Sequence, residues 1–343
     1  MRFPRSVGSL SVALALVTML SPRAWSEEGS SKYPDAVMMQ KAAAKSQQSA
    51  LVTTALGNNL YLFSGDGATV IAVADDNSVL LINSGMADRV TELAHTVYEA
   101  VQRPVTTLVN TDWHFDHTGG NQYFSSFGVT IIAQANTKKR IAAEHKSVRK
   151  TYAANNPSSF NVVASPWAAA VENPASERYA LRGIPTVAFD ESMTINLDNE
   201  ELIFCHYGAG HTDGDTVVFF QTSNLVLLGD IFPGHEYPWI DVRSGGSLAG
   251  VIQTVDRVLS ASNEQTRIIP GQGPVLHKAE LQDYRNMLVN IQARIQELLE
   301  SGASADQIIA AAPTSDFDSE WGGGDVSGQV FTSLIIESMA QGR

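Results

Sequence analysis

The hexapeptide DWHFDH, residues 112–117, is the feature that most constrains the fold of this chain. It directly follows the apolar run Val105–Val109, which is typical of a buried strand, and it precedes Gly119 and Gly120. Imidazole nitrogens and carboxylate oxygens bind divalent ions such as zinc at about 2.0–2.2 Å. The stiff strand end would hold these donors, and the two glycines would let the backbone turn tightly. The hexapeptide therefore predicts a metal site rather than a polar loop that contains two histidines.

The first 26 residues have the pattern of a signal peptide. Arg2 and Arg5 precede an apolar stretch over residues 7–20, and Ala24-Trp25-Ser26 resembles a cleavage site with small residues at its ends. The apolar stretch is too short to span a bilayer comfortably, so we expect no stable membrane anchor. The predicted location is the periplasm or the outside of the cell, after cleavage near Ser26.

The net charge argues against several kinds of partner, and the cysteine content excludes an intramolecular disulfide. The formal net charge is −13, and cleavage after Ser26 would remove three arginines and no acid, leaving −16. Such an acidic protein is a poor partner for nucleic acid and for anionic membrane surfaces. The single cysteine, Cys205, cannot form an intramolecular disulfide, and its apolar surroundings predict a buried thiol. With 44% hydrophobic residues, the chain can form one large core or a core with an appendage.

The apolar patterns predict an α/β protein. We divide the chain into a signal peptide (1–26), an N-terminal lead segment (27–56), one domain (57–300) and a C-terminal helical tail (301–343), with a loop-like insertion at about 151–183. The expected strands are Leu60–Phe63, Thr69–Val73, Val79–Ile82, Val105–Val109, Val129–Ala133, Thr186–Phe189, Met193–Leu197, Leu202–Tyr207, Thr216–Phe220, Leu225–Leu228 and Arg267–Ile269. The expected helices are Met86–Val101, Asn136–Lys150, Ser247–Leu259, Lys278–Leu299, Ala303–Ala312 and Val330–Met339. Strands followed by helices, twice over, suggest two sheets packed face to face with helices outside.

Three further motifs end apolar strands as the hexapeptide does. They are the stretch GAGHTDGD at residues 208–215, the Gly229-Asp230 turn, and PGQGP at residues 270–274. In this order the motifs resemble those of the metallo-β-lactamase-fold metallohydrolase superfamily, over residues 60 to about 275. The resemblance implies an αββα sandwich of two mixed sheets with helices on the outer faces.

The resemblance also implies a set of metal ligands. The first ion would be held by Asp112, His114 and His211. The second would be held by Asp116, His117 and Gln272, with Asp230 bridging the two ions. The donors suit zinc, as one or two ions, although iron or manganese is also compatible.

Two of these positions depart from the family pattern. Asp112 stands where the first histidine of HxHxDH is expected, and an additional carboxylate can still act as a ligand. Gln272 stands where the family has the histidine of PGHGP, and a neutral amide is a weak ligand for zinc. Gln272 is therefore either a ligand or a hydrogen-bond partner of one.

Other polar residues close to these motifs have alternative roles. Asp215 either orients an imidazole or is an ordinary turn carboxylate. His235 is a candidate to line the pocket, and His277 is expected to be a surface residue or to cap the helix that it begins.

The nature of residue 230 separates the possible functions. By resemblance, true β-lactamases of this fold carry Cys or Ser there, whereas glyoxalase II-like and lactonase-like hydrolases carry a bridging Asp, as at Asp230. We therefore expect a metal-dependent hydrolase that cleaves an ester, thioester, lactone or amide bond in a small-molecule substrate. Asp116 would orient the attacking water or accept its proton. The alternatives are a β-lactamase and a non-catalytic binding protein with a degenerate metal site, and the oligomeric state is unknown.

Overall fold

The computed structural model describes residues 49–65, 67–143 and 183–341. The predicted signal peptide, most of the lead segment and the insertion up to residue 182 lie outside these ranges, as does the second half of the helix expected at Asn136–Lys150. Within the described ranges, none of the helices has both the length and the apolar composition that crossing a membrane would require.

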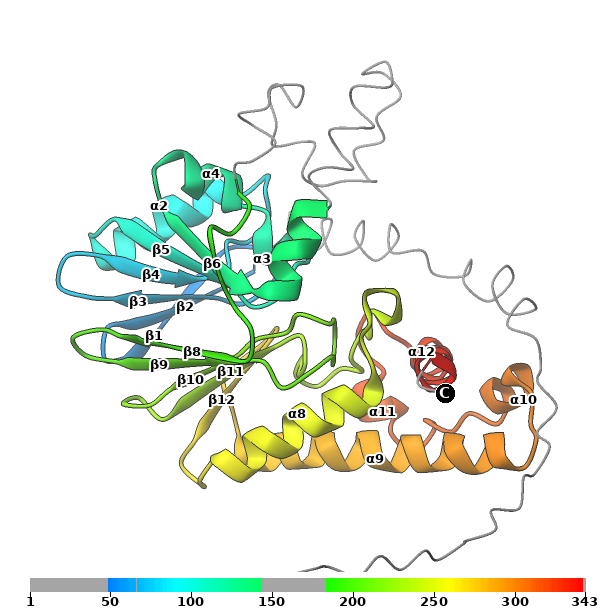
Figure 1. Cartoon of the computed structure of the whole chain (residues 1–343). Coiled ribbons are helices and arrows are strands. Elements are labelled where there is room, and N and C mark those ends of the chain that lie inside the picture. The colour runs from blue at the N-terminus through cyan, green and yellow to red at the C-terminus, as the bar shows by residue number, and fades with distance from the viewer. Residues whose placement is uncertain (1–48, 66, 144–182, 342–343) are drawn as a thin grey trace, which may run out of the picture.

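Two β-sheets form the centre of the molecule (Figure 1). The first has seven strands in chain order, and the second has six in the order β13-β12-β11-β10-β9-β8. The strands of the first sheet are β1 (Val52–Gly57), β2 (Leu60–Ser64), β3 (Val70–Ala74), β4 (Val79–Ile82), β5 (Val105–Asn110), β6 (Thr130–Gln134) and β7 (Val187–Phe189). The strands of the second are β8 (Ser192–Asn196), β9 (Glu201–Cys205), β10 (Val217–Phe220), β11 (Leu225–Gly229), β12 (Arg267–Pro270) and β13 (Leu276–His277).

Both sheets are mixed. In the first, β1 to β4 pair antiparallel, whereas β4, β5, β6 and β7 pair parallel. In the second, β11 and β12 are parallel and the other neighbours are antiparallel. Strands β4 and β11 are fully buried and have continuous apolar sequences, whereas the first half of β5 and most of β7 are partly or fully exposed.

Three hydrophobic clusters fill the spaces between the layers of the αββα sandwich. One lies between the sheets, one between the first sheet and its helices, and one between the second sheet and its helices. Strand β10 shows how one run serves two layers: Val218 and Phe220 face the other sheet, and Val217 and Phe219 face the helices. The predicted sandwich of two mixed sheets with outer helices is confirmed.

The long helices agree with the sequence patterns. Helix α2 (Val90–Val101) packs on the first sheet, and α8 (Leu248–Ala261) and α9 (Lys278–Glu300) cover the second (Figure 1). Ser247 caps α8 by accepting a hydrogen bond from Gly250 N. The Glu280 carboxylate accepts a hydrogen bond from His277 N at the start of α9, so His277 lies at a helix cap as expected.

The C-terminal residues pack on the main core. Helices α10 (Ala305–Ala310), α11 (Asp318–Trp321) and α12 (Gly328–Gln341) follow α9; α10 lies at its end, and α11 and α12 lie along it (Figure 1). Their buried side chains belong to the same hydrophobic cluster as α8 and α9; among them are Ile308, Trp321, Phe331 and Ile335.

The two glycines after the hexapeptide have a different role from the one expected. They lie between two short helices, α3 (Phe115–Thr118) and α4 (Asn121–Ser126), with right-handed φ values of −57° and −82°. The chain turns at these residues as expected, but their φ values are ones that any residue can adopt. A Cβ on Gly119 would lie 2.6 Å from Gly85 O, and one on Gly120 would meet Ser84 O, so the glycines permit close packing of the chain after β4.

Candidate metal centre

The four polar motifs meet where the two sheets come together. Thr216 N donates to Thr111 O at 2.7 Å, which joins the stretch after His211 to the end of β5. Thr69 N donates to Gly271 O at 3.0 Å, which joins the start of β3 to the end of β12. These bonds between the sheets fix the spacing of the loops that carry the predicted ligands.

Four predicted ligands surround the first metal position. Asp112, His114, His211 and Asp230 each place one donor atom within 4.8 Å of the others. His211 Nε2 lies 2.8 Å from His114 Nδ1 and 3.5 Å from Asp230 Oδ2. Asp112 Oδ1 lies 3.8 Å from His114 Nδ1 and also accepts a hydrogen bond from His114 N at 2.8 Å. Two imidazoles from different sheets thus point at one spot between two carboxylates.

The outer nitrogens of both imidazoles are bonded to one loop. His211 Nδ1 donates to Trp239 O at 2.7 Å, and His114 Nε2 donates to Asp241 Oδ2 at 3.2 Å. Because a carbonyl or carboxylate oxygen only accepts, these bonds place the protons on the outer nitrogens. With an ion bound, the inner nitrogens would offer their lone pairs to the first position, as metal-binding imidazoles do.

His117 and two carboxylates surround the second position. The His117 Nδ1–H bonds to Thr111 Oγ1 at 2.9 Å, because that hydroxyl donates its own proton to Asn83 Oδ1. His117 Nε2 is fully buried and has no hydrogen-bond partner among the described residues. It lies 3.4 Å from Asp230 Oδ1 and 3.8 Å from Asp116 Oδ2. Such an unsatisfied atom facing two carboxylates fits a metal ligand.

Asp230 belongs to both groups of donors. Its two carboxylate oxygens point to different positions, Oδ2 toward His211 and Oδ1 toward His117. This is the arrangement that the predicted bridging role requires.

The electrostatics of the cluster also fit a cation. Burial lowers the pKa of His114, but the hydrogen bond to Asp241 and the nearby carboxylates outweigh it and raise the pKa to about 9. Burial also lowers the pKa of His117, but the carboxylates of Asp112 and Asp116 outweigh this effect and raise the pKa well above its usual value. Burial raises the pKa of Asp116. The carboxylates thus create a negative potential that a divalent ion would satisfy in place of protons.

Gln272 follows a glycine that touches the cluster. A Cβ on Gly271 would lie 2.5 Å from Asp230 Oδ1, so the backbone of the PGQGP stretch passes directly beside that carboxylate. The half-buried Gln272 therefore comes next to a residue in contact with the second position. Whether Gln272 is a ligand stays a prediction.

The Gln272→His variant tests that prediction. We expect tighter binding of the second zinc ion, by about 1–3 kcal/mol or roughly 5- to 150-fold, because an imidazole is a better zinc donor than an amide. Zinc titration of the variant and the parent protein compares the second dissociation constants. Gln265→His places the same side chain at an exposed position and serves as the control. Coincident curves for all three proteins would show that Gln272 does not face the metal position.

Sequence reasoning missed the residues that orient the imidazoles. Asp241 and Trp239 lie in the apolar stretch YPWID at residues 237–241, which has neither strand nor helix periodicity. The acid that ends this apolar run was the only signal for Asp241. Asp215 was considered for an orienting role, but its carboxylate instead accepts hydrogen bonds from Gly210 N and from Thr212 N and Oγ1. It shapes the loop that carries His211.

The structure places His235 beside the C-terminal helices. His235 is exposed, and its ring lies 5.6 Å from that of Trp321, on the side of the loop that faces the C-terminal helices.

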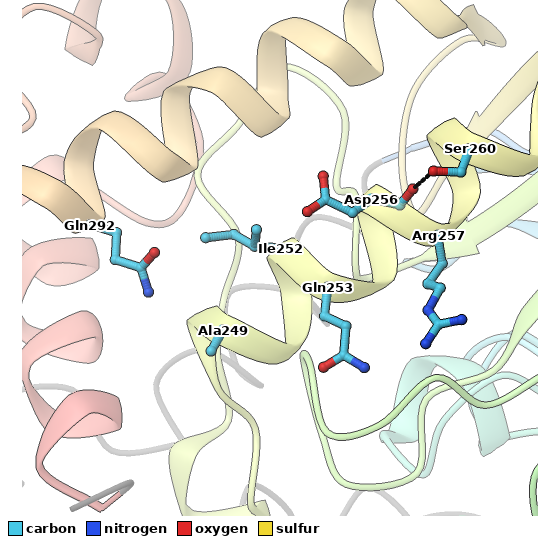
Figure 2. Close-up of a pocket in the computed structure, with 7 residues that line it drawn as sticks. All are labelled: Ala249, Ile252, Gln253, Asp256, Arg257, Ser260 and Gln292. Atoms are coloured by element: carbon cyan, nitrogen blue, oxygen red, sulfur yellow. Dashed lines mark hydrogen bonds between the residues drawn. The ribbon is translucent and has the colours of Figure 1, made fainter.

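A cavity of about 470 Å³ lies along the outer side of α8, lined by residues that include Asp256 and Arg257 (Figure 2). It contains none of the predicted metal ligands, so the candidate centre is defined by its donors rather than by this cavity.

The Asp241→Asn variant tests the orienting role of that carboxylate. Asp241 Oδ1 also accepts a hydrogen bond from Ser244 N, so an amide with one acceptor oxygen cannot satisfy both neighbours. We expect metal affinity at the first position to fall by about 10- to 100-fold. Competition with a chelator measures this, with Asp256→Asn, in the cavity beside α8, as the control. Equal affinities in the two variants would contradict the assignment.

Comparison with known proteins agrees with this geometry. The family model of the Metallo-beta-lactamase superfamily matches residues 64–293. The chain belongs to the metallo-β-lactamase superfamily. Membership in this superfamily supports a metal-dependent hydrolase.

Three members of the superfamily illustrate the similarity. A metallo-beta-lactamase type 2 from Bacteroides fragilis is 23% identical over 268 residues, covering 75% of this chain and 92% of that protein. The structure of a metallo-beta-lactamase from Pontibacter korlensis has a TM-score of 0.54 at 18% identity, covering 70% of this chain and 100% of that one. The DIM-1 metallo-beta-lactamase has a TM-score of 0.51 at 16% identity, covering 69% of this chain and 96% of that one. At these identities the structural likeness shows the fold alone.

Proposed function

We propose that this metallo-β-lactamase superfamily member is an exported hydrolase that cleaves an ester, thioester, lactone or amide bond in a small-molecule substrate. The observation that supports it most is the convergence of three imidazoles whose outer nitrogens are already hydrogen-bonded. Their inner nitrogens face three carboxylates at the point where the sheets meet. We assign zinc to the centre, as one or two ions, with iron or manganese also compatible with the donors.

The residues of the centre divide into those that would hold an ion and one that would also handle a proton. Asp112, His114 and His211 would hold the first ion, Asp116, His117 and Gln272 the second, and Asp230 both. When bound, the metal supplies Lewis acidity, which lowers the pKa of a water molecule and polarises a carbonyl oxygen. Asp116 is 11% exposed, and its burial raises the pKa of the carboxyl. Such a carboxylate beside the second position can orient water and accept a proton.

A β-lactamase is the second candidate, and the names of the similar proteins favour it. Asp230 favours the first candidate, since the sequence resemblance associates an acid there with the glyoxalase II-like and lactonase-like hydrolases. The departures at Asp112 and Gln272 also separate the chain from the usual histidine-rich pattern. A third possibility, a binding protein with a degenerate site, rests on Gln272.

One assay distinguishes these candidates. Protein purified from the periplasm is analysed for metal content and then tested on esters, thioesters, lactones, simple amides and a chromogenic cephalosporin. We expect bound metal and turnover of at least one acyl substrate that exceeds turnover of the cephalosporin. Preference for the cephalosporin would favour the β-lactamase, and bound metal without turnover would favour the binding protein. Protein that binds no metal would contradict the proposal.

Export is tested separately. We expect the mature protein to begin near Glu27, because residues 24–26 match a cleavage site. N-terminal sequencing of the periplasmic fraction measures this. Soluble cytoplasmic protein with an intact Met1 would contradict the signal peptide.

A further inference from the structure

One loop, residues 231–241, connects the bridging carboxylate to both of the first imidazoles. It begins directly after Asp230 and ends at Asp241, which bonds to His114 Nε2 at 3.2 Å. Trp239 O, within the loop, accepts from His211 Nδ1 at 2.7 Å. Asp241 N also donates to His211 O at 2.9 Å. The position of this loop therefore sets the orientation of both imidazoles at the first metal position.

The C-terminal helices hold the opposite side of the same loop through Tyr237. This side chain is 1% exposed, and its hydroxyl donates to Asp318 Oδ1 at 2.9 Å. Its backbone N donates to Trp321 O at 2.9 Å. Its ring stacks on Phe331, with ring centroids 4.8 Å apart and an interplanar angle of 15°. These partners all lie beyond residues 64–293, the part of the chain that matches the family model.

Apolar packing extends these contacts. Ile240 and Val242 belong to the same buried cluster as Phe331 and Ile335 of α12. Leu248 N, at the start of α8, donates to Ser338 Oγ of α12 at 3.2 Å. The loop is thus enclosed between the metal position on one side and the C-terminal helices on the other.

We propose that residues 303–341 are part of the metal-binding apparatus, with Tyr237 as the positioning residue through which they act. Tyr237 touches none of the donors, but it holds the loop whose Trp239 carbonyl and Asp241 carboxylate orient the two imidazoles. Loss of the outer hydrogen bonds of metal-binding histidines weakens metal affinity, so loosening the loop weakens it too. This inference rests on the metal centre proposed above.

The test compares zinc affinity in variants of the full chain. Tyr237→Phe removes the hydroxyl and keeps the ring, and Asp318→Ala removes its acceptor. Asp318→Asn keeps an acceptor oxygen and should restore binding. Ile308→Val is the matched control, since Ile308 is fully buried in the same cluster but lies in α10, away from the loop. Competition with a chelator gives the first dissociation constant, the visible spectrum of the cobalt(II)-substituted protein reports the coordination geometry, and thermal unfolding reports stability.

We expect Tyr237→Phe and Asp318→Ala to raise the first zinc dissociation constant by about 3- to 10-fold, less than loss of a direct partner of an imidazole. Both should alter the cobalt spectrum, whereas Asp318→Asn and Ile308→Val should match the parent protein. Unchanged affinity in Tyr237→Phe and Asp318→Ala, or an equal loss in Ile308→Val at a similar unfolding temperature, would overturn the inference alone. A parent protein that binds no zinc would overturn the metal centre and the inference with it.

Discussion

The His114→Ala and His211→Ala variants are each expected to lose the ion at the first position. The two inner nitrogens lie 2.8 Å apart and are the only imidazole donors predicted at that position, so either truncation leaves one. One imidazole and two carboxylates bind zinc much less tightly than two imidazoles and two carboxylates. Metal stoichiometry after dialysis measures the effect, and activity on the acyl substrates should fall to background.

The control for this prediction is His95→Ala. His95 lies on α2 with 76% of its side chain exposed, so the same truncation there should leave the metal content unchanged. Full retention of metal in both His114→Ala and His211→Ala would show that the ion binds elsewhere.

Asp116→Asn is expected to reduce kcat by about 10²- to 10⁴-fold, because an amide cannot accept a proton. The same change removes a charged donor from the second position, where Asp116 Oδ2 lies 3.8 Å from His117 Nε2. The first ion should remain bound, since the four donors of that position do not include Asp116. Steady-state kinetics and metal stoichiometry together measure the two effects.

Asp283→Asn, an exposed acid on α9, is the control for loss of charge. Equal kcat values in Asp116→Asn and the parent protein would exclude the proton-accepting role. Loss of both ions from Asp116→Asn would instead show that the two positions depend on each other more strongly than the geometry indicates.

Most of the sandwich could be predicted from the sequence because its strands are short apolar runs that end in turns. Strand β1 was missed because it is an edge strand with mostly exposed residues, such as Val52, and its sequence has no apolar alternation. The short helices after the hexapeptide were also missed. Gly119 and Gly120 indicated a turn, and only the neighbouring strand loop explains why side chains are excluded there.

The candidate centre divides in the same way. The donors were visible because each follows an apolar strand, and the structure brings together Asp112, His114, Asp116, His117, His211 and Asp230. Their partners were not visible, because Asp241 and the Trp239 carbonyl come from a loop with no repeating pattern. The contribution of Thr111 depends on a chain of hydrogen bonds from Asn83 to His117, which no local pattern encodes.

The donors of the first metal position come from two different sheets, and this affects how the protein unfolds. His114 and His211 are 97 positions apart in the chain, and an ion bound to both would act as a cross-link between them. The single cysteine gives this chain no intramolecular disulfide for the same task. Linkage adds about 2.7 kcal/mol to the free energy of unfolding when free metal exceeds its dissociation constant 100-fold. Scarcity of metal would therefore shorten the lifetime of the folded protein in the presence of proteases, as well as lower its activity.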